Sequence, residues 1–351
     1  MRLAPYPNPV GAVRALALTA LLSVAALAPA RAADGAGAAP APILIERQGS
    51  FQAGGKVIGD AAQGTLHCDH GFVEFQVPPH ARKTALFLWH SSSVHVWQQR
   101  WDGGEGYQSL LLRRGYPVYL WDGPRVGRAK MGCEGYSYTP VIGQDQRNWI
   151  SWRFGPKPGE WFPGVQFPKA DPAALDQAMS ARYDEFDIAG NAHLEAEAAA
   201  QAIDRIGPSV LLTNSAGGWR AMLAALRSDN VKGIVAYEPA AFVFPEGEGP
   251  QGEETGFGPT HVPLETFMRL TRIPIQLVWG DNTQTTFWAR NVALSRQFVE
   301  IVNAHGGHAE ILMLPAAGLH GNTHIPFADL NNAQVADQLA LFLRRNELDE
   351  R

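Results

Sequence analysis

The sequence has few cysteines and few charged residues, and both shortages limit what the chain can be. Only 18% of the 351 residues are charged and 46% are apolar, which excludes a disordered, collagen-like or nucleic-acid-coating polypeptide. After position 42 there is no repeat of fixed period and no charged or low-complexity linker that would separate two domains. We therefore expect one large globular domain, residues 43–351, with long loops supplied by 36 glycines and 25 prolines.

Residues 1–32 have the pattern of a secretory signal peptide. Arg2 and Arg14 precede an apolar run over 15–28, and the run ends at Ala30-Arg-Ala32, where two small residues mark a cleavage site. A transmembrane anchor is the competing interpretation, but the run is shorter than the ~20 residues that a bilayer requires. We predict export to the periplasm or the medium, with no membrane span after cleavage and a flexible leader over 33–42.

Removal of the signal peptide takes three arginines and no acidic residue, so the net charge moves from −5 to −8. Such a chain is not expected to bind nucleic acid.

The chain has two cysteines, Cys68 and Cys133. In an oxidising compartment they are expected to form a disulfide, because a zinc site would need further ligands at recognisable spacing. The bond would close a loop of about 65 residues and contribute roughly 4 kcal/mol, as an upper value. Two buried free thiols are the alternative.

The apolar pattern predicts an α/β fold with a mostly parallel sheet. Short strands at 43–46, 50–53 and 72–77 suggest an opening antiparallel hairpin. Six later apolar runs are typical of strands buried on both faces: 84–89, 117–121, 210–213, 233–237, 275–279 and 310–314. Helical patterns lie between or after these runs, at 189–206, 219–227, 287–304 and 331–345.

A candidate nucleophile follows the third of these runs. In the segment Thr213-Asn-Ser-Ala-Gly217, Ser215 comes directly after a buried strand and before a helix. A sharp turn there would lift the hydroxyl clear of the sheet, and the helix N-terminus would stabilise negative charge. An ordinary tight turn or a phosphate loop is the alternative, but no G-x-x-x-x-G-K-[ST] pattern accompanies it.

This segment resembles the nucleophile elbow G-x-S-x-G of the α/β-hydrolase superfamily, with Thr213 in place of the first glycine. The resemblance covers roughly residues 70–345 and implies a central sheet with helices on both faces. It also implies a histidine base and an acid later in the chain, in the order nucleophile, acid, base.

The base is expected in the loop Pro315–His324, just before the last helix. We predict His320, because its neighbours Gly318 and Gly321 leave it room to reach the elbow. His324 is the second choice, with a bracing role as its simpler interpretation.

Glu238 and Asp281 are the candidate acids. Many family members carry the acid about three residues after a glycine that corresponds to Gly280, where this chain has Thr283. Glu238 ends the strand after the elbow and precedes a proline, which resembles secreted bacterial esterases with a glutamate acid. We therefore prefer Glu238, and interpret Asp281 as a turn cap.

The family comparison also suggests the oxyanion hole. The amide of Ala216 would be one donor, and Ser92, in the segment His90-Ser-Ser-Ser93, would be the other. Ser91 or a serine hydroxyl is the alternative to the Ser92 amide.

An insertion over about 124–185 is expected to form a cap. The apolar run 117–121 and the run 210–213 before the elbow are separated by nearly ninety residues, far more than one crossover helix needs. The insertion is rich in aromatic residues, which would either line a pocket over the serine or form a small core of their own.

Together these residues predict an exported serine esterase that acts through an acyl-enzyme on a small or medium apolar or aromatic ester, with no metal and no organic cofactor. Lactone hydrolysis and acyl transfer would use the same residues. A binding protein that has lost turnover is a further alternative, whereas a dehalogenase or epoxide hydrolase would need a carboxylate where Ser215 stands.

Overall fold

The structure is a computed structural model that describes residues 40–351 except 136–137, 185–187 and 285. Ile43–Arg351 form one compact unit. The predicted signal peptide and most of the predicted leader lie outside the described residues. None of the helices described has both the length and the apolar character needed to cross a membrane.

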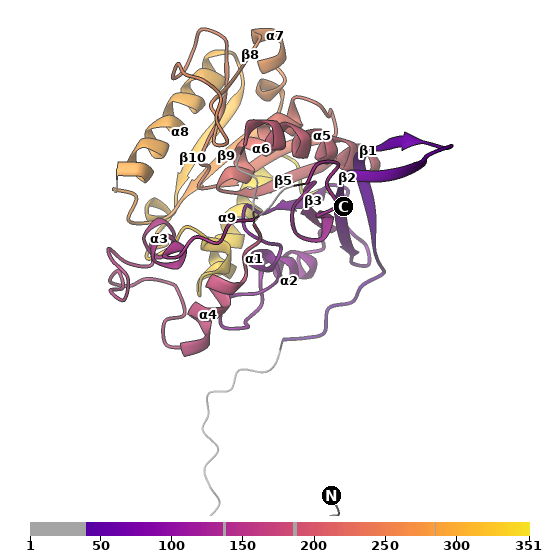
Figure 1. Cartoon of the computed structure of the whole chain (residues 1–351). Coiled ribbons are helices and arrows are strands. Elements are labelled where there is room, and N and C mark those ends of the chain that lie inside the picture. The colour runs from indigo at the N-terminus through magenta and orange to yellow at the C-terminus, as the bar shows by residue number, and fades with distance from the viewer. Residues whose placement is uncertain (1–39, 136–137, 185–187, 285) are drawn as a thin grey trace, which may run out of the picture. The chain divides into compact units, whose positions relative to one another are not determined.

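The described residues form an eight-stranded sheet (Figure 1). Its five neighbouring pairs from β4 to β10 are parallel, and the two pairs that involve β2 are antiparallel. This confirms the mostly parallel sheet predicted from the apolar runs. Across the sheet the strands are β1 (Arg47–Asp60), β2 (Gly64–Val77), β4 (Val118–Asp122), β3 (Ala85–Trp89), β5 (Ser209–Asn214), β6 (Val231–Tyr237), β9 (Pro274–Trp279) and β10 (His308–Met313).

Helices cover both faces of the sheet. The helices described are α1 (His95–Gln98), α2 (Tyr107–Arg113), α3 (Gln144–Ser151), α4 (Pro172–Ser180), α5 (Ala189–Ile206), α6 (Ala216–Ala225), α7 (Leu264–Phe267), α8 (Thr286–Ala304) and α9 (Asn332–Arg345). Short 3₁₀ turns occupy Gly127–Ala129, Leu270–Arg272, Leu314–Ala317 and Pro326–Ala328, and a separate two-stranded ribbon pairs β7 (Val243–Pro245) with β8 (Thr260–Val262).

Two apolar clusters fill the space between these layers. One joins the sheet to α5, α6 and α8, and the other joins it to α1, α2 and α9. The central strands contribute side chains to both clusters, because successive residues of a strand point to opposite faces of the sheet. Along β5, Leu211 belongs to the first cluster and Val210 and Leu212 to the second. Burial on both faces is what made these strands recognisable as unbroken apolar runs.

The opening hairpin is longer than the sequence suggested. The expected strands at 50–53 and 72–77 lie within β1 and β2, but 43–46 is not a strand. Gly54 and Gly55, which look like the end of a strand in the sequence, both have positive φ inside β1. Gly54 pairs with His70 and Lys56 with Cys68, so the pair of glycines bends the strand without ending it.

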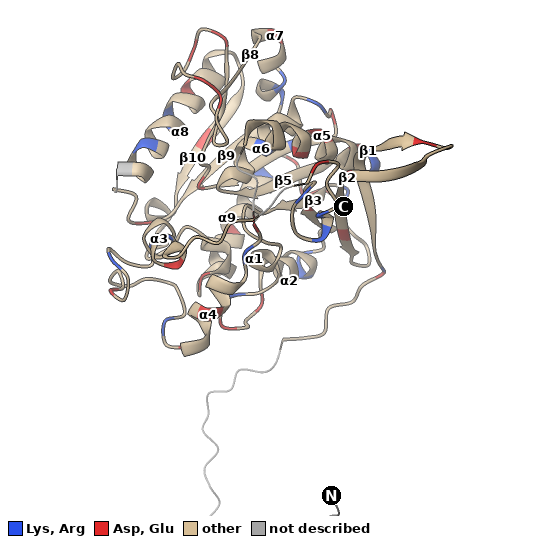
Figure 2. Ribbon diagram, viewed as in Figure 1, with Lys and Arg blue, Asp and Glu red and all other residues tan. Residues whose placement is uncertain are grey.

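Cys68 on β2 is joined to Cys133 by a disulfide. The bond attaches the hairpin to the segment 123–188, which contains α3 and α4 and lies between β4 and α5. Over the whole described chain, acidic and basic residues are interspersed with one another (Figure 2).

The aromatic residues of this insertion mostly pack on each other. The ring centroids of Trp149 and Trp161 lie 4.3 Å apart, as do those of Phe154 and Phe167. These side chains belong to the same apolar cluster as α9. Of the two roles considered, these four side chains take that of a local core, whereas Trp152 lines a pocket.

Candidate active site

The turn after β5 places Ser215 at the start of α6 in a strained backbone conformation. Its φ is +53° and its ψ is −124°, a region that non-glycine residues rarely adopt. The small residues that follow are needed for close approach. A Cβ atom at Gly217 would lie 3.0 Å from the carbonyl oxygen of Trp89, and one at Gly218 would lie 2.8 Å from Pro239 Cβ.

Thr213, which replaces the first glycine of the elbow pattern, fits beneath this turn. Its side chain is fully buried, and its hydroxyl has no hydrogen-bond partner among the described residues. The Cβ that Gly217 lacks would sit 3.6 Å from Thr213 Cβ. That separation is an ordinary van der Waals contact, so Thr213 is accommodated here without a clash.

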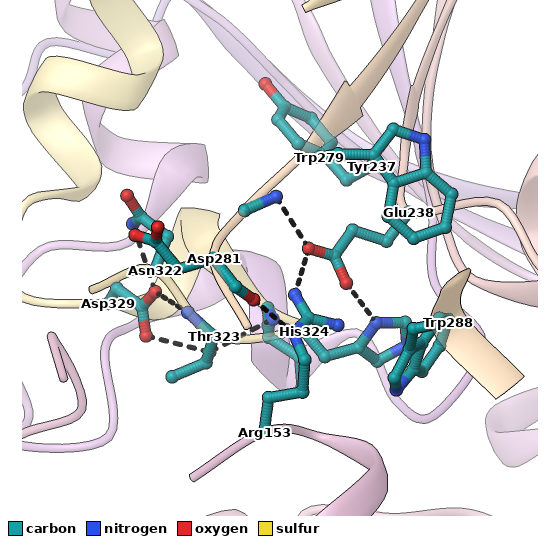
Figure 3. Close-up of polar contacts among 12 residues, drawn as sticks. Arg153, Tyr237, Glu238, Trp279, Asp281, Trp288, Asn322, Thr323, His324 and Asp329 are labelled. Carbon is teal, nitrogen blue, oxygen red and sulfur yellow. Dashed lines mark hydrogen bonds and ion pairs between the residues drawn. The ribbon is translucent and has the colours of Figure 1, made fainter. Parts of the chain in front are cut away.

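Glu238 lies one strand away, at the carboxyl end of β6, and is fully buried. It too has a positive φ, of +52°. Its Oε1 accepts the Gly280 amide at 2.8 Å and a hydrogen bond from the Arg153 guanidinium, and its Oε2 lies 2.7 Å from His324 Nδ1 (Figure 3).

Backbone and side-chain contacts fix His324 in place. Its amide donates to the Trp152 carbonyl at 3.0 Å, and its carbonyl accepts from Asn214 Nδ2 at 3.1 Å. The ring packs against Trp288 with centroids 4.4 Å apart (Figure 3). Since Asn214 directly precedes Ser215, one side chain ties the histidine loop to the elbow.

The charges around this pair favour a neutral histidine and an ionised glutamate. Burial opposes ionisation of Glu238, but the charge of Arg153 and the hydrogen bond with His324 outweigh it, so the pKa of Glu238 is lowered. Burial also lowers the pKa of His324, and Arg153 lowers it further against the opposing effect of Glu238. With Nδ1 donating to the carboxylate, Nε2 of the neutral ring is the atom that can accept a proton.

Ser215 and His324 line one pocket, with a volume of about 170 Å³. Trp152 from the insertion and Phe257 supply aromatic walls. The remaining lining residues are Ser91, Ser92, Asn214, Ala216 and Ile325.

The structure places a different histidine in this pocket from the one predicted. The side chain of His320 is exposed, and His320 is not among the pocket-lining residues. Its carbonyl accepts from Gln166 Nε2 at 3.1 Å, and the next amide, that of Gly321, donates to the Asp281 carboxylate. These contacts fix the backbone at 320–321, and His324, later in the same loop, is the histidine that lines the pocket.

Asp281, the second candidate acid, has a supporting position. Its carboxylate accepts a hydrogen bond from the Gly321 amide, and its backbone carbonyl accepts one from Arg153 Nε at 2.6 Å. No hydrogen bond joins it to His324 in the part of the chain that the structure describes.

The predicted oxyanion residues both lie in the pocket with Ser215. Among the described residues, no hydrogen bond uses the amide of Ser92 or of Ala216. The loop that carries Ser92 is held by a buried pair, since His90 Nε2 lies 2.8 Å from Asp122 Oδ1. Arg128 Nε donates to the other Asp122 oxygen at 2.6 Å.

Three supporting residues could not be recognised from the sequence: Arg153, Asn214 and Asp329. Asp329 is buried, and its carboxylate accepts from the Thr323 amide at 2.7 Å and the Thr323 hydroxyl at 2.9 Å, beside His324. Burial is the main cause that raises the pKa of Asp329 to about 7. Arg153 and Asn214 contact residues that lie far from them in the sequence, and no local pattern marks any of the three contacts.

No group of three or more histidine, cysteine or acidic side chains among the described residues is arranged to hold a metal ion.

No protein-family profile matches the chain. The solved structure of "a Novel Bacterial Esterase" is 26% identical, with a TM-score of 0.73 over 88% of this chain and 98% of that chain. "Probable secreted lipase phiG" of Fungal sp. (strain ATCC 74256) is 24% identical over 291 residues, 71% of this chain and 78% of that protein.

The parallel sheet, the strained serine turn and the similarity to the bacterial esterase define the chain as a member of the α/β-hydrolase superfamily. Within it, these similarities support a carboxylic ester hydrolase.

Proposed function

We propose that the protein is an exported serine esterase in which Ser215 is the nucleophile, His324 the general base and Glu238 the acid that orients the base. One observation carries the proposal: His324 is bonded to buried Glu238 and lines the same pocket as Ser215. The proposal keeps the nucleophile and the acid expected from the sequence and moves the base from His320 to His324.

The proton transfers follow from the hydrogen bonds. Glu238 holds the Nδ1–H of His324, so Nε2 takes the proton of the Ser215 hydroxyl as the oxygen attacks the ester carbonyl. The imidazolium then returns that proton to the departing alcohol, which leaves an acyl-enzyme. Water attacks the acyl-enzyme with the same base, and the acid product is released.

The negative charge of each tetrahedral intermediate requires donors. The Ala216 amide at the start of α6 and the Ser92 amide are assigned this role, since both residues line the pocket. Each donor is worth about 3 kcal/mol of transition-state stabilisation.

Arg153 keeps Glu238 charged throughout this cycle. A buried carboxylate without it would tend to take up a proton, and a neutral Glu238 would stabilise the imidazolium far less.

The pocket around Ser215 suits an uncharged ester. At about 170 Å³, with walls from Trp152, Phe257 and Ile325, it holds the reacting carbonyl and a small group. Export is supported by the disulfide and by the similarity to a secreted lipase. We propose the periplasm or the medium as the place of action.

The test is labelling with a short-chain fluorophosphonate, followed by mass spectrometry of the modified peptide and turnover of p-nitrophenyl acetate. We expect modification of Ser215 and loss of both signals in Ser215→Ala. An unlabelled Ser215 with no turnover would contradict the proposal and favour a binding protein.

Two matched pairs of variants test the other assignments. His324→Ala should lose about 10⁴-fold or more in kcat, while His320→Ala should keep nearly all of it. Glu238→Gln should lose about 10⁴-fold, while Asp281→Asn should be affected much less. The reverse ranking in either pair would return the role to His320 or to Asp281.

A further inference from the structure

A second and larger pocket lies beside the one that contains Ser215. Its volume is about 300 Å³. Its floor is the segment 240–244 that follows Glu238, one wall is the loop 250–259 between β7 and β8, and the other is the first part of α8.

Two observations connect this pocket with the nucleophile. Phe257 lines both pockets and therefore stands between them. Ala240, which lines the larger pocket, donates its amide to the Ser215 carbonyl at 3.2 Å. A molecule that enters the larger pocket therefore lies next to the elbow.

The surfaces of the larger pocket are those of a site that binds an apolar group. Phe242, Phe244 and Leu294 make it apolar inside. Phe257 and Phe287, at its edge, are 48% and 54% exposed. Large aromatic side chains that are half exposed around one hollow are typical of a binding site.

The polar residues of the pocket balance one another. Arg290 and Glu253 both line it and carry opposite charges, so the pocket favours neither anions nor cations. Asn291 is only 3% exposed, and its side-chain nitrogen has no hydrogen-bond partner among the described residues. It offers one uncharged polar contact between the aromatic and aliphatic side chains of the pocket.

We propose that this pocket binds the larger arm of the ester, an uncharged apolar chain or ring system, while the pocket around Ser215 holds the carbonyl and the smaller arm. The inference rests on the proposed function. An engineered cavity of about 150 Å³ binds one benzene, so 300 Å³ accommodates roughly a dozen non-hydrogen atoms. The substrate class is thus an ester with one small arm and one apolar arm of up to about that size.

The test compares two ester series in which one arm is kept small: ethyl alkanoates of increasing acyl length, and alkyl acetates of increasing alcohol length. Acid release is followed by pH-stat. For the arm that enters the pocket, kcat/KM should rise roughly threefold to fourfold per methylene and level off at about ten to twelve carbons.

Leu294→Trp should narrow the pocket without contacting the triad. We expect kcat/KM of Leu294→Trp to level off at a shorter chain than that of the wild type. Leu341→Trp is the matched control, because Leu341 is an exposed leucine on α9 and lines neither pocket. Phe287→Ala, an exposed position, is a second variant that should move the plateau to longer chains.

The outcomes separate the two proposals. If Ser215 is labelled by the short fluorophosphonate but the chain-length profiles of Leu294→Trp and Phe287→Ala match that of the wild type, the pocket does not bind the substrate arm and this inference is overturned. If the wild type is neither labelled nor active, the esterase function itself is wrong and the inference falls with it.

Discussion

Arg153 offers the sharpest test of how the buried charges are arranged. Both it and Glu238 have side chains with 0% exposure, and they form an ion pair. Replacing Arg153 with methionine leaves the Glu238 carboxylate buried with two remaining donors, the Gly280 amide and His324. Breaking a buried pair from one side costs about 3–5 kcal/mol.

A second loss adds to this value. Arg153 also donates to the Asp281 carbonyl, a contact worth about 1 kcal/mol. The expected total of about 4–6 kcal/mol is a large part of the roughly 5–15 kcal/mol that stabilises a typical protein. At about 2 °C per kcal/mol for a chain of this size, Tm should fall by about 10 °C.

The assay is urea unfolding followed by tryptophan fluorescence, with Tm from calorimetry. Arg147→Met is the matched control, since Arg147 is an exposed arginine on α3, and should change the free energy of unfolding by less than about 0.5 kcal/mol. The double variant Arg153→Met/Glu238→Gln removes both charges and should be less destabilised than the sum of the single variants by about 2 kcal/mol or more.

Two results would refute this reasoning. One is an Arg153→Met protein within about 1 kcal/mol of the wild type, because the carboxylate would then not need the cation. The other is strict additivity in the double variant, which would mean that the two side chains do not interact energetically.

Three further predictions concern the fold and the pH dependence. Replacing Cys68 and Cys133 with serine should lower the free energy of unfolding by up to about 4 kcal/mol, as measured by urea unfolding, and reducing agent should then have no further effect. Because burial lowers the pKa of His324 below 6.5, the acid limb of the kcat/KM profile should have its midpoint below pH 6.5; a midpoint near pH 7.5 would contradict this. Gly280→Ala would place a Cβ 3.1 Å from Glu238 Oε1, and should reduce kcat by about tenfold or more with p-nitrophenyl acetate, whereas unchanged kcat would show that the carboxylate can shift at no cost.

The fold could be predicted because its central strands are buried on both faces and so appear as unbroken apolar runs. β5 and β6 begin and end within two residues of the expected runs. The hairpin was harder to predict, because Gly54 and Gly55 have the composition of a turn but bend a continuous strand. Whether these glycines end the strand or bend it is determined by the pairing of their neighbours with residues of β2.

The site was less predictable where it depends on contacts between distant residues. The serine turn and the acid both follow a buried strand directly, and that local pattern is visible in the sequence. His320 and His324 belong to the same loop. Glycine neighbours indicate that the backbone at His320 has conformational freedom, but they do not indicate which of the two side chains points toward Ser215. Asp329 binds the amide just before His324, and Asn214 binds its carbonyl; neither contact has a local signal.

The placement of Glu238 at the end of β6 has a consequence for modifying the protein. In many relatives that the sequence resembles, the acid belongs to the loop after the strand that corresponds to β9. Here that loop leads into α8, whose first turns wall the larger pocket. Libraries randomised at Phe287, Arg290 and Leu294 alone, with Trp288 kept because it packs on His324, should therefore alter substrate range without changing Ser215, Glu238 or His324.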